Sequence, residues 1–316
     1  MLIFNDLIRD FEAGHMPKLA LPTRLKYESL LQCHIAKDLG HLEIACLTTR
    51  VIDAWLETKK DAGLSSATRT TLKNLVHSIF VRADAWGTYE GKDPTNHATV
   101  GRHKPLYERR MLTTEETSDL LRRMPEDARI ICMVALFCGL RISEVMGLCW
   151  KHVDFGRRVL LIRQRYYRGD LDMVKSPKSV RDIPFGDLEP ILRSKYPGIH
   201  AHEQFCFSVK TQMGHTETRN DGIIRKYFLR KAAEELGLYR PGFGFHDLRR
   251  EAVTAISSDI GAIQACRFAG HTHVNTTLLY GLSDYLLQKG AVERMQSPYG
   301  DLLEILSEKH ESDCSI

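Results

Sequence analysis

The stretch AGHTHVNTTLLY, residues 269–280, organises the rest of this 316-residue chain. A Gly-His pair is followed, nine residues on, by a Tyr at the end of a Thr-rich run that is compatible with a helix. A Tyr hydroxyl has an ordinary pKa near ~10, so it needs a nearby base or cationic surroundings to act as a nucleophile at neutral pH. If Tyr280 has that role, the chain should hold phosphate-binding arginines and acid/base groups upstream.

Two upstream segments carry such arginines. GLRISE begins at Gly139, which ends an apolar run, and it contains Arg141; HDLRR places His246 and Arg249 on one face of a helix. Two guanidinium groups aimed at one point suit a phosphodiester, because each offers a planar fork of donors to the non-bridging oxygens. They would also stabilise charge that develops on phosphorus. Taken singly, either Arg could be an ordinary ion-pair partner, with Glu144 holding Arg141.

The candidate proton-transfer groups are histidines and a lysine. His246 and His271 are candidates for the base and for a hydrogen-bond donor to phosphate. Lys175 lies at a predicted β-turn and could protonate a leaving oxygen, and Lys178 is close enough in sequence to compete for that role. His273 has no role in this scheme.

Composition limits the classes of protein without naming a function. With 43% hydrophobic and 27% charged residues, the chain is long enough for two domains or one large domain. A net charge of +4 neither requires nor excludes a DNA partner. The eight cysteines show no CxxC spacing, which favours reduced thiols in a cytoplasmic protein. No signal peptide is indicated, and no apolar run approaches the ~20 residues of a membrane span.

Metal and nucleotide sites are not indicated. His246, His271 and His273 have no Cys or carboxylate at ligand spacing, and the His-Glu pair at residues 202–203 lacks the second His of a zinc protease helix. A GFG fragment at residues 242–244 lacks the strand, the third Gly and the Lys of a nucleotide-binding loop. We therefore expect no cofactor and no metal.

Helical periodicity dominates the first part of the chain. Four or five helices are expected, and their predicted starts are residue 1, Thr23, Thr49 and Ser65 or Ser66. Because no convincing strand interrupts them, residues 1–100 are predicted to form a small α domain. The polar and basic stretch at residues 101–111 is the predicted linker.

A second domain is predicted for residues 112–285. It opens with a helix start at Thr113 or Thr114, and the apolar run from Ala128 to Cys138 is predicted to be a buried helix. Three strand-like segments separated by turns predict one small antiparallel sheet, and they are residues 159–162, 172–175 and 181–184. The chain after Asp187 is predicted to be helical apart from a loop. The predicted fold class is mainly α with a small antiparallel β-sheet, an α+β protein.

Together these motifs resemble those of the tyrosine recombinase, or phage integrase, family. The family's catalytic order is Arg, Lys, His-x-x-Arg, His or Trp, and Tyr. The residues that match this order and spacing within residues 112–285 are Arg141, Lys175, His246, Arg249, His271 and Tyr280. Two segments nearer the N-terminus, TRLKYESLLQCHIAKDLG and SSATRTTLKNLVHSIFVRADAWG, are similar to helices of the family's core-binding domain. The resemblance therefore implies a helical, SAM-like core-binding domain followed by a tyrosine-recombinase catalytic domain.

The resemblance also implies a mechanism on double-stranded DNA. Tyr280 would attack the scissile phosphate, giving a 3′-phosphotyrosyl link and a free 5′-hydroxyl. Lys175 would protonate the leaving oxygen, and His246 would handle the Tyr proton. Because the phosphotyrosyl link conserves the bond energy, rejoining to a partner strand would need no ATP.

Further residues would bind the DNA. Arg141 and Arg249 would hold the scissile phosphate, and His271 would donate a hydrogen bond to it. Additional candidates for contacts with DNA are basic residues in and after the first domain, namely Arg69, Lys73, Arg102 and Lys104.

An assembly of several protomers is implied as well. Members of the family act as tetramers on two DNA sites, linked by exchange of C-terminal segments. Residues 286–316 comprise an amphipathic stretch and an acidic tail, and the amphipathic stretch could exchange between protomers or pack on its own domain. Accessory directionality or DNA-bending proteins are further candidate partners, whereas no membrane partner is expected.

The implied function is site-specific recombination, for integration or excision of a phage or another mobile element. Three alternatives remain: a recombinase that resolves chromosome or plasmid dimers, a type IB topoisomerase, and a DNA-binding protein that keeps the fold without the activity. The small helical N-terminal domain and the spacing from AGH to Tyr280 favour a recombinase over a topoisomerase. The complete set of catalytic positions argues against the inactive binder.

Overall fold

The chain divides into two compact units, Met1–Arg109 and Arg110–Ile316. The computed structural model describes residues 2–101, 111–174, 179–210, 217–270 and 285–301. The boundary between the units falls within the predicted linker at residues 101–111, of which residues 102–110 lie outside the described parts.

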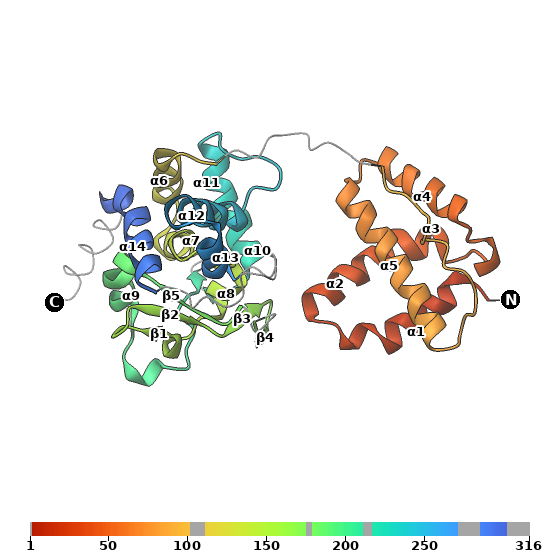
Figure 1. Cartoon of the computed structure of the whole chain (residues 1–316), viewed down its shortest axis with the longest axis horizontal. Helices are drawn as coiled ribbons and strands as arrows, with labels where there is room; N and C mark the ends of the chain where they lie inside the picture. Colours follow the sequence, from red (N-terminus) through yellow and green to blue (C-terminus); the bar gives the residue numbers. More distant parts are fainter. Residues whose placement is uncertain (1, 102–110, 175–178, 211–216, 271–284, 302–316) are drawn as a thin grey trace. The chain divides into compact units, whose positions relative to one another are not determined.

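The first unit is built from helices (Figure 1). Its α-helices are α1 (Phe4–Gly14), α2 (Leu21–Leu30), α3 (Ala36–Leu39), α4 (Thr49–Asp61) and α5 (Ser66–Ala85). A π-helical turn, Leu31–Ile35, joins α2 to α3. The predicted helix from Thr23 is therefore one continuous helical stretch that starts two residues earlier, at Leu21.

Side-chain caps set two of the helix starts. The hydroxyl of Thr48, one residue before the predicted cap, accepts a hydrogen bond from the backbone N–H of Val51 and begins α4. Ser65, one of the two predicted caps of α5, accepts a hydrogen bond from the N–H of Thr68 at 3.2 Å. The apolar face of α5 is buried, and the rings of Phe4 and Phe80 stack with centroids 5.3 Å apart. Burial of such side chains contributes about 1.5–3 kcal/mol each.

The second unit places a buried helix among amphipathic ones. Its α-helices are α6 (Thr114–Arg122), α7 (Glu126–Phe137), α8 (Ile142–Gly147), α9 (Glu189–Lys195), α10 (Asp221–Ile224), α11 (Arg230–Glu235), α12 (Phe245–Ile260), α13 (Ala262–Ala269) and α14 (Tyr285–Gln296). Every residue of α7 from Ile130 to Phe137 is buried, which confirms the predicted buried helix. Helix α12 packs against α7, α13 and α14. None of the helices in the described parts is long and apolar enough to cross a bilayer.

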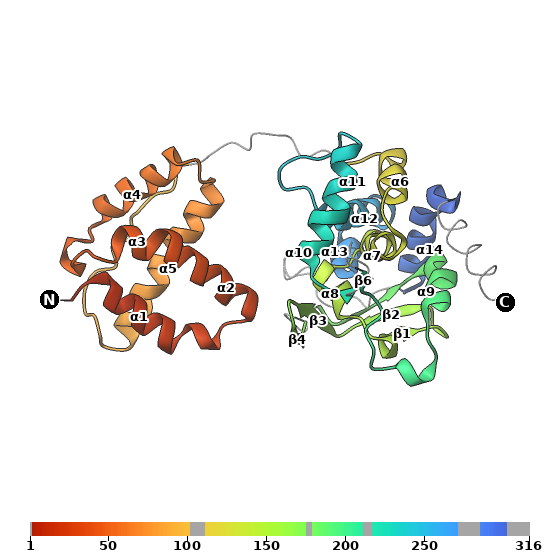
Figure 2. The same cartoon turned by 180° about the vertical axis from the view of Figure 1, so that it is seen from behind.

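The strands of the second unit are short and antiparallel. β1 (Val153–Asp154), β2 (Val159–Ile162) and β5 (Arg181–Pro184) form one sheet in the order β1-β2-β5, and this sheet lies to one side of α7 and α12 (Figures 1 and 2). β3 (Gln164–Tyr167) pairs with β4 (Asp170–Met173), and β6 (Val209–Lys210) pairs with β7 (Glu217–Thr218).

The prediction of a single sheet was wrong in one segment. The stretch predicted at residues 172–175 belongs to a separate hairpin with β3, whose polar sequence QRYY has no apolar alternation to reveal a strand. The turn of this hairpin places Arg168 and Gly169 at positive φ, 49° and 92°, as tight two-residue turns require. The prediction that the chain after Asp187 is helical apart from one loop was also wrong, because β6 and β7 lie there. These two-residue strands are too short to show an alternating pattern in the sequence.

The start of the C-terminal segment packs on its own unit. Ala291 and Val292 of α14 are buried against the second unit's core. The buried amide of Gln296 accepts a hydrogen bond from the N–H of Asp187 at 2.8 Å and donates one to the carbonyl of Phe185 at 3.1 Å. The part of the predicted exchange segment up to residue 301 is therefore anchored within the chain, while residues 302–316 lie outside the described parts.

A buried carboxyl group links α12 to the beginning of the unit. Glu251 is 9% exposed, and the hydroxyl of Thr117 in α6 donates a hydrogen bond to its Oε2 at 3.2 Å. Burial raises the pKa of Glu251 to about 7, although hydrogen bonds from Thr117 and from the N–H of Leu112 oppose the shift. The folded protein therefore favours the protonated form of this side chain.

This raised pKa predicts a loss of stability toward alkaline pH. An ordinary value of 4.5 in the unfolded chain and about 7 in the folded one means that the folded state binds the proton more tightly. Stability from this group is complete below pH 4.5 and is lost as the pH rises through 7. At about 1.4 kcal/mol per pKa unit, we expect Glu251→Gln to raise the free energy of unfolding by about 3–4 kcal/mol at pH 8 and to change it little at pH 4.5.

Denaturant unfolding at the two pH values measures the effect. Glu235→Gln, which changes an exposed carboxylate of the same unit, is the matched control and should leave the pH dependence unchanged. A pH dependence in Glu251→Gln equal to that of the wild type would contradict the assignment.

Candidate active site

Arg141 and Arg249 both lie near Glu144, which the sequence analysis named as a possible ion-pair partner of Arg141. Arg141 precedes α8, and its Nη1 lies 2.8 Å from Oε1 of Glu144 while its backbone N–H donates to Oε2 at 2.9 Å. Arg249 lies in the second turn of α12, with Nη1 3.8 Å from Oε2 of Glu144. The two arginines come from sequence positions far apart, so tertiary packing creates this site.

Carbonyl groups at two helix ends orient the guanidinium groups. Nη1 of Arg249 donates to the carbonyl of Gly139, just beyond α7, and its Nη2 donates to the carbonyl of Ala269 at the end of α13, both at 2.5 Å. Nη2 of Arg141 donates to the carbonyl of Gly270 at 3.2 Å. Helix C-termini leave such carbonyls without partners inside the helix and carry partial negative charge. The arginines therefore satisfy both helix ends.

Gly139 is required where α7 turns toward Arg141. Its φ is +57°, and a Cβ atom there would come within 2.4 Å of the ring of Phe268. A larger residue would push α7 and α13 apart, and with them the acceptors of Arg249.

Glu144 remains ionised among the arginines. Its side chain is only 3% exposed. Burial acts to raise the pKa of this carboxyl, but the charges and hydrogen bonds of Arg181 and Arg141 outweigh it, and the net pKa is lowered. Burial and repulsion from Arg141 lower the pKa of Arg249 to about 9, although the charge of Glu144 opposes this shift. Because this value still lies above neutral pH, Arg249 is charged at pH 7.

His246 favours its neutral form. It lies in the first turn of α12, and burial lowers its pKa, reinforced by the charges of Arg249 and Arg141 and opposed by Asp247. Asp247 holds this turn in place, because it accepts hydrogen bonds from the N–H of Gly244 at 2.9 Å and from Nη2 of Arg250 at 2.6 Å. A neutral imidazole held rigidly can accept a proton.

Several predicted site residues lie outside the described parts of the chain, namely Lys175, Lys178, His271, His273 and Tyr280. The described residues immediately before them in the sequence are Val174 and Gly270. Gly270, whose carbonyl accepts from Arg141, immediately precedes residues 271–284, and Val174 immediately precedes residues 175–178.

Arg181 also contacts Glu144, although the sequence analysis gave Arg181 no role. Arg141, Arg181 and Arg249 thus form an arginine cluster around one carboxylate. Arg181 is 7% exposed and pairs with Oε2 of Glu144 through Nη2 at 2.9 Å. In the sequence RDIP it shares a strand face with the buried Ile183. A charged residue on the same strand face as a buried apolar residue was the sequence signal that could have indicated an internal ion pair.

The predicted DNA contacts of the first unit have mixed outcomes. Arg69 is fully buried and donates to the carbonyl of Gly101 at 3.0 Å, and this burial argues against a direct contact with DNA. Nζ of the half-buried Lys73 donates to the carbonyl of Ala98 at 2.8 Å, and its contact with DNA stays a prediction. Arg102 and Lys104 lie outside the described residues.

A basic pocket opens on the second unit beside α10. Its volume is about 460 Å³, and the cations that line it are Arg168, Arg225, Lys226 and Arg230. None of the residues that line it in the described parts is acidic. Arg225 and Lys226 are exposed, while Arg230 also pairs with Glu234 through a 2.8 Å hydrogen bond. Such a concentration of one sign of charge suits the phosphates of a nucleic acid.

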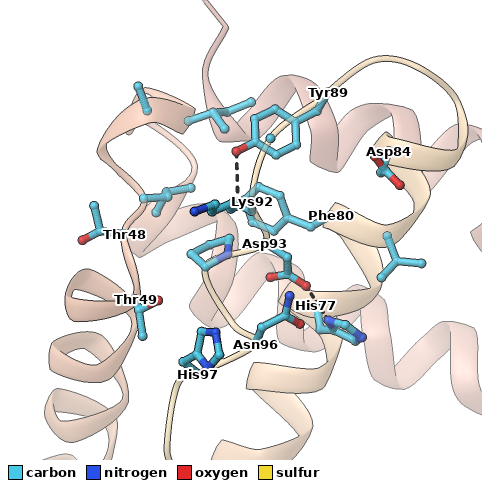
Figure 3. Close-up of a pocket in the computed structure, with 16 residues that line it drawn as sticks. Thr48, Thr49, His77, Phe80, Asp84, Tyr89, Lys92, Asp93, Asn96 and His97 are labelled. Atoms are coloured by element: carbon cyan, nitrogen blue, oxygen red, sulfur yellow. Dashed lines mark hydrogen bonds and ion pairs between the residues drawn. The ribbon is translucent and has the colours of Figure 1, made fainter.

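A larger pocket of about 610 Å³ in the first unit has a different character (Figure 3). Lys92 lines it together with Asp84 and Asp93, and Asp93 also pairs with Nδ1 of His77 at 2.5 Å. The two carboxylates outnumber the lysine, so this pocket lacks the positive field of the basic pocket, and we assign it no ligand. Among the residues that the structure describes, no group of three or more His, Cys, Asp or Glu side chains could hold a metal ion.

Comparisons with known proteins agree with these features. The profile of the phage integrase family matches residues 110–285. Among similar proteins are an integrase/recombinase of Escherichia coli and one of Pseudomonas aeruginosa. Each is 26% identical over 246 residues, which cover 66% of this chain and 69% of the relative.

Solved structures show the same fold. The Tn1549 transposon integrase in complex with transposon right end DNA has a TM-score of 0.69 at 21% identity, covering 93% of this chain and 99% of the other. A lambda integrase tetramer bound to a Holliday junction has a TM-score of 0.67 at 18% identity, covering 87% and 79%. Because the family profile spans more than half of the chain, this protein belongs to the phage integrase family and is a tyrosine-type site-specific DNA recombinase.

Proposed function

We propose that Tyr280 is the nucleophile of this recombinase and that Arg141 and Arg249 bind the scissile phosphate. The observation that carries the proposal is the convergence of both guanidinium groups on Glu144, beside the carbonyl of Gly270. The cluster has more positive than negative charge, and a phosphodiester anion would balance it. As the oxygen of Tyr280 bonds to phosphorus, the bond to the 5′-oxygen breaks, which leaves a 3′-phosphotyrosyl link.

The proton transfers are assigned to His246 and Lys175. The lowered pKa of His246 keeps its imidazole neutral, so that it can take the proton of the attacking hydroxyl. Lys175, or Lys178 in its place, would give a proton to the leaving 5′-oxygen, and His271 would donate a hydrogen bond to the phosphate. The reverse steps join the link to a partner strand without ATP.

The proposed substrate is duplex DNA that carries the ends of a phage or another mobile element. The similar transposon integrase was solved with its transposon end DNA, and the lambda integrase as a tetramer on a Holliday junction. We propose a homotetramer on two DNA sites for this chain too. Accessory directionality or DNA-bending proteins remain a prediction from the resemblance.

The basic pocket is proposed to bind the backbone of that duplex. Its exposed cations, Arg225 and Lys226, lie next to each other in the π-helical turn Arg225–Leu229, and Arg168 reaches it from the β3–β4 turn. Phosphate contacts of this kind fix the position of a protein on DNA, whereas base contacts supply sequence specificity.

The first prediction concerns the nucleophile. A nicked duplex that carries the recombination site, mapped from the repeats flanking the coding region, should form a covalent adduct with the wild type that survives SDS. Tyr280→Phe should form none, because a phenyl ring has no nucleophilic oxygen. Tyr285→Phe, at the next Tyr along the chain, is the matched control and should still form the adduct. An adduct with Tyr280→Phe would overturn the assignment, and relaxation of supercoiled DNA without the site would favour a topoisomerase.

The second prediction concerns pH. Because burial and two arginines lower the pKa of His246 below its ordinary 6.5, the neutral base persists into mildly acidic solution. Single-turnover cleavage should therefore lose rate on an acidic limb whose midpoint lies below pH 6.5. His246→Gln should cut more slowly, by about 100-fold, and should lack this limb. His200→Gln, at an exposed histidine, should retain the wild-type profile; an acidic limb that persists in His246→Gln would contradict the role of His246.

The third prediction concerns the basic pocket. Arg225→Ala should weaken binding to duplex DNA of any sequence, and the plot of log affinity against log salt should become shallower by about 0.9 if one phosphate contact is lost. Filter binding or fluorescence anisotropy at several salt concentrations measures both. Arg122→Ala, at an exposed arginine of α6 outside the pocket, should leave the slope unchanged. Equal slopes for Arg225→Ala and the wild type would exclude the pocket from the DNA interface.

A further inference from the structure

We propose that Arg181 is a positioning residue of the active site, which holds Glu144 so that Arg141 and Arg249 stay aimed at the phosphate. The inference rests on the proposed function of those two arginines. The side chain of Arg181 is only 7% exposed, so we expect it not to touch the DNA.

The side chain of Arg181 makes four hydrogen bonds. Nε donates to the carbonyl of Phe268 at 2.8 Å, and Nη1 donates to the carbonyl of Ser179 at 3.0 Å. Both Nη atoms donate to Glu144, Nη1 to Oε1 at 3.2 Å and Nη2 to Oε2 at 2.9 Å. Four of the five N–H donors of the guanidinium are thereby used, so it is fixed in orientation.

These contacts tie together three parts of the fold that carry the proposed chemistry. Arg181 belongs to β5, and Phe268 lies near the end of α13. Glu144 belongs to α8, the helix that begins directly after Arg141. Gly270 follows α13 at φ +63°, and a Cβ there would lie only 3.0 Å from Nη1 of Arg181, a tight contact that would displace the guanidinium. Arg181 therefore lies directly against the turn from which the chain continues to Tyr280.

The three arginines contact Glu144 in different ways. The side chain of Arg181 donates to both carboxylate oxygens of Glu144 and is 7% exposed. The side chain of Arg141 donates to Glu144 through Nη1 alone and is 33% exposed. Arg249 lies 3.8 Å from the same carboxylate and bonds to helix-end carbonyls instead. With Arg181 neutralising Glu144, the outer two arginines keep charge for an anion.

Loss of Arg181 would leave a buried carboxylate without its main partner. An unpaired buried charge is strongly unfavourable, so neighbouring cations would move toward it. Arg141 and Arg249 are the cations within reach. Displacement of phosphate-binding groups by about 1 Å can lower a rate by about 100-fold. The expected defect therefore lies in the cleavage step and not in binding to DNA.

The test compares the full-length wild type with Arg181→Met and Arg181→Lys on the nicked recombination-site duplex. We expect Arg181→Met to cleave ~100-fold more slowly in single turnover, with DNA affinity within about threefold of the wild type. Arg181→Lys should also be slow, because one ammonium group cannot span Glu144 and the carbonyl of Phe268. Arg157→Met, at a 60% exposed arginine next to the same sheet, is the matched control and should cleave normally.

A second substrate shows through which group Arg181 acts. In a duplex with sulfur in place of the scissile 5′-oxygen, the leaving thiolate needs no proton from a general acid. If Arg181 acts through the phosphate-binding arginines, Arg181→Met should be slowed equally on both substrates. Restoration of the rate by sulfur would assign Arg181 to the general acid and overturn the inference. So would wild-type cleavage by Arg181→Lys.

A double variant keeps the test independent of folding. Arg181→Met with Glu144→Gln removes both charges of the buried pair, and it should unfold at a higher temperature and cleave faster than Arg181→Met alone. Failure of either gain would overturn the inference. If the wild type forms no adduct on either substrate, the proposed function fails first; if the wild type forms it and Arg181→Met cleaves equally well, only the positioning role fails.

Discussion

A single buried carboxylate, Glu144, determines how the arginines of this recombinase are arranged. It accepts hydrogen bonds from Arg181 and Arg141 and lies 3.8 Å from Arg249. Removing an ion from water costs several kcal/mol, which an ion pair offsets only when its geometry is good and its remaining donors are satisfied. Three guanidinium groups around one carboxylate meet that condition and still leave unbalanced positive charge. The site is therefore stable in the free protein and electrostatically suited to an anion.

Helix ends supply the other half of this arrangement. The carbonyls of Gly139, Phe268, Ala269 and Gly270 all accept hydrogen bonds from the arginine cluster. These carbonyls lie at the C-terminal ends of α7 and α13, where the backbone has no further helical partners. The packing of α7 and α13 against α12 thus aligns the acceptors, and the arginines in turn close both helix ends. Core packing and site geometry are consequently not separable in this unit.

Local signals in the sequence predicted much of the fold and part of the site. Ser65 and Thr113, each one of two caps that the sequence offered, begin their helices. The motifs that contain Arg141 and Arg249 also lie at helix starts. Contacts between distant positions were not predictable in this way. Arg181 lies 37 residues from Glu144. The strand face that it shares with Ile183 is a local sign of burial but does not identify Glu144 as the partner. Arg69, chosen from charge alone, proved to be buried, since a helix face cannot be assigned from charge without its neighbours.

Helix α12 shows how burial selects which of its side chains are charged. Burial lowers the pKa of His246 and raises that of Glu251, so in both cases it favours the neutral form. Arg249, between them on the same helix, is also desolvated, but its high intrinsic pKa and the nearby Glu144 keep it charged. One helix thereby presents a fixed cation beside an uncharged imidazole. An imidazole must be neutral to accept a proton, and burial at the start of α12 provides that condition for His246.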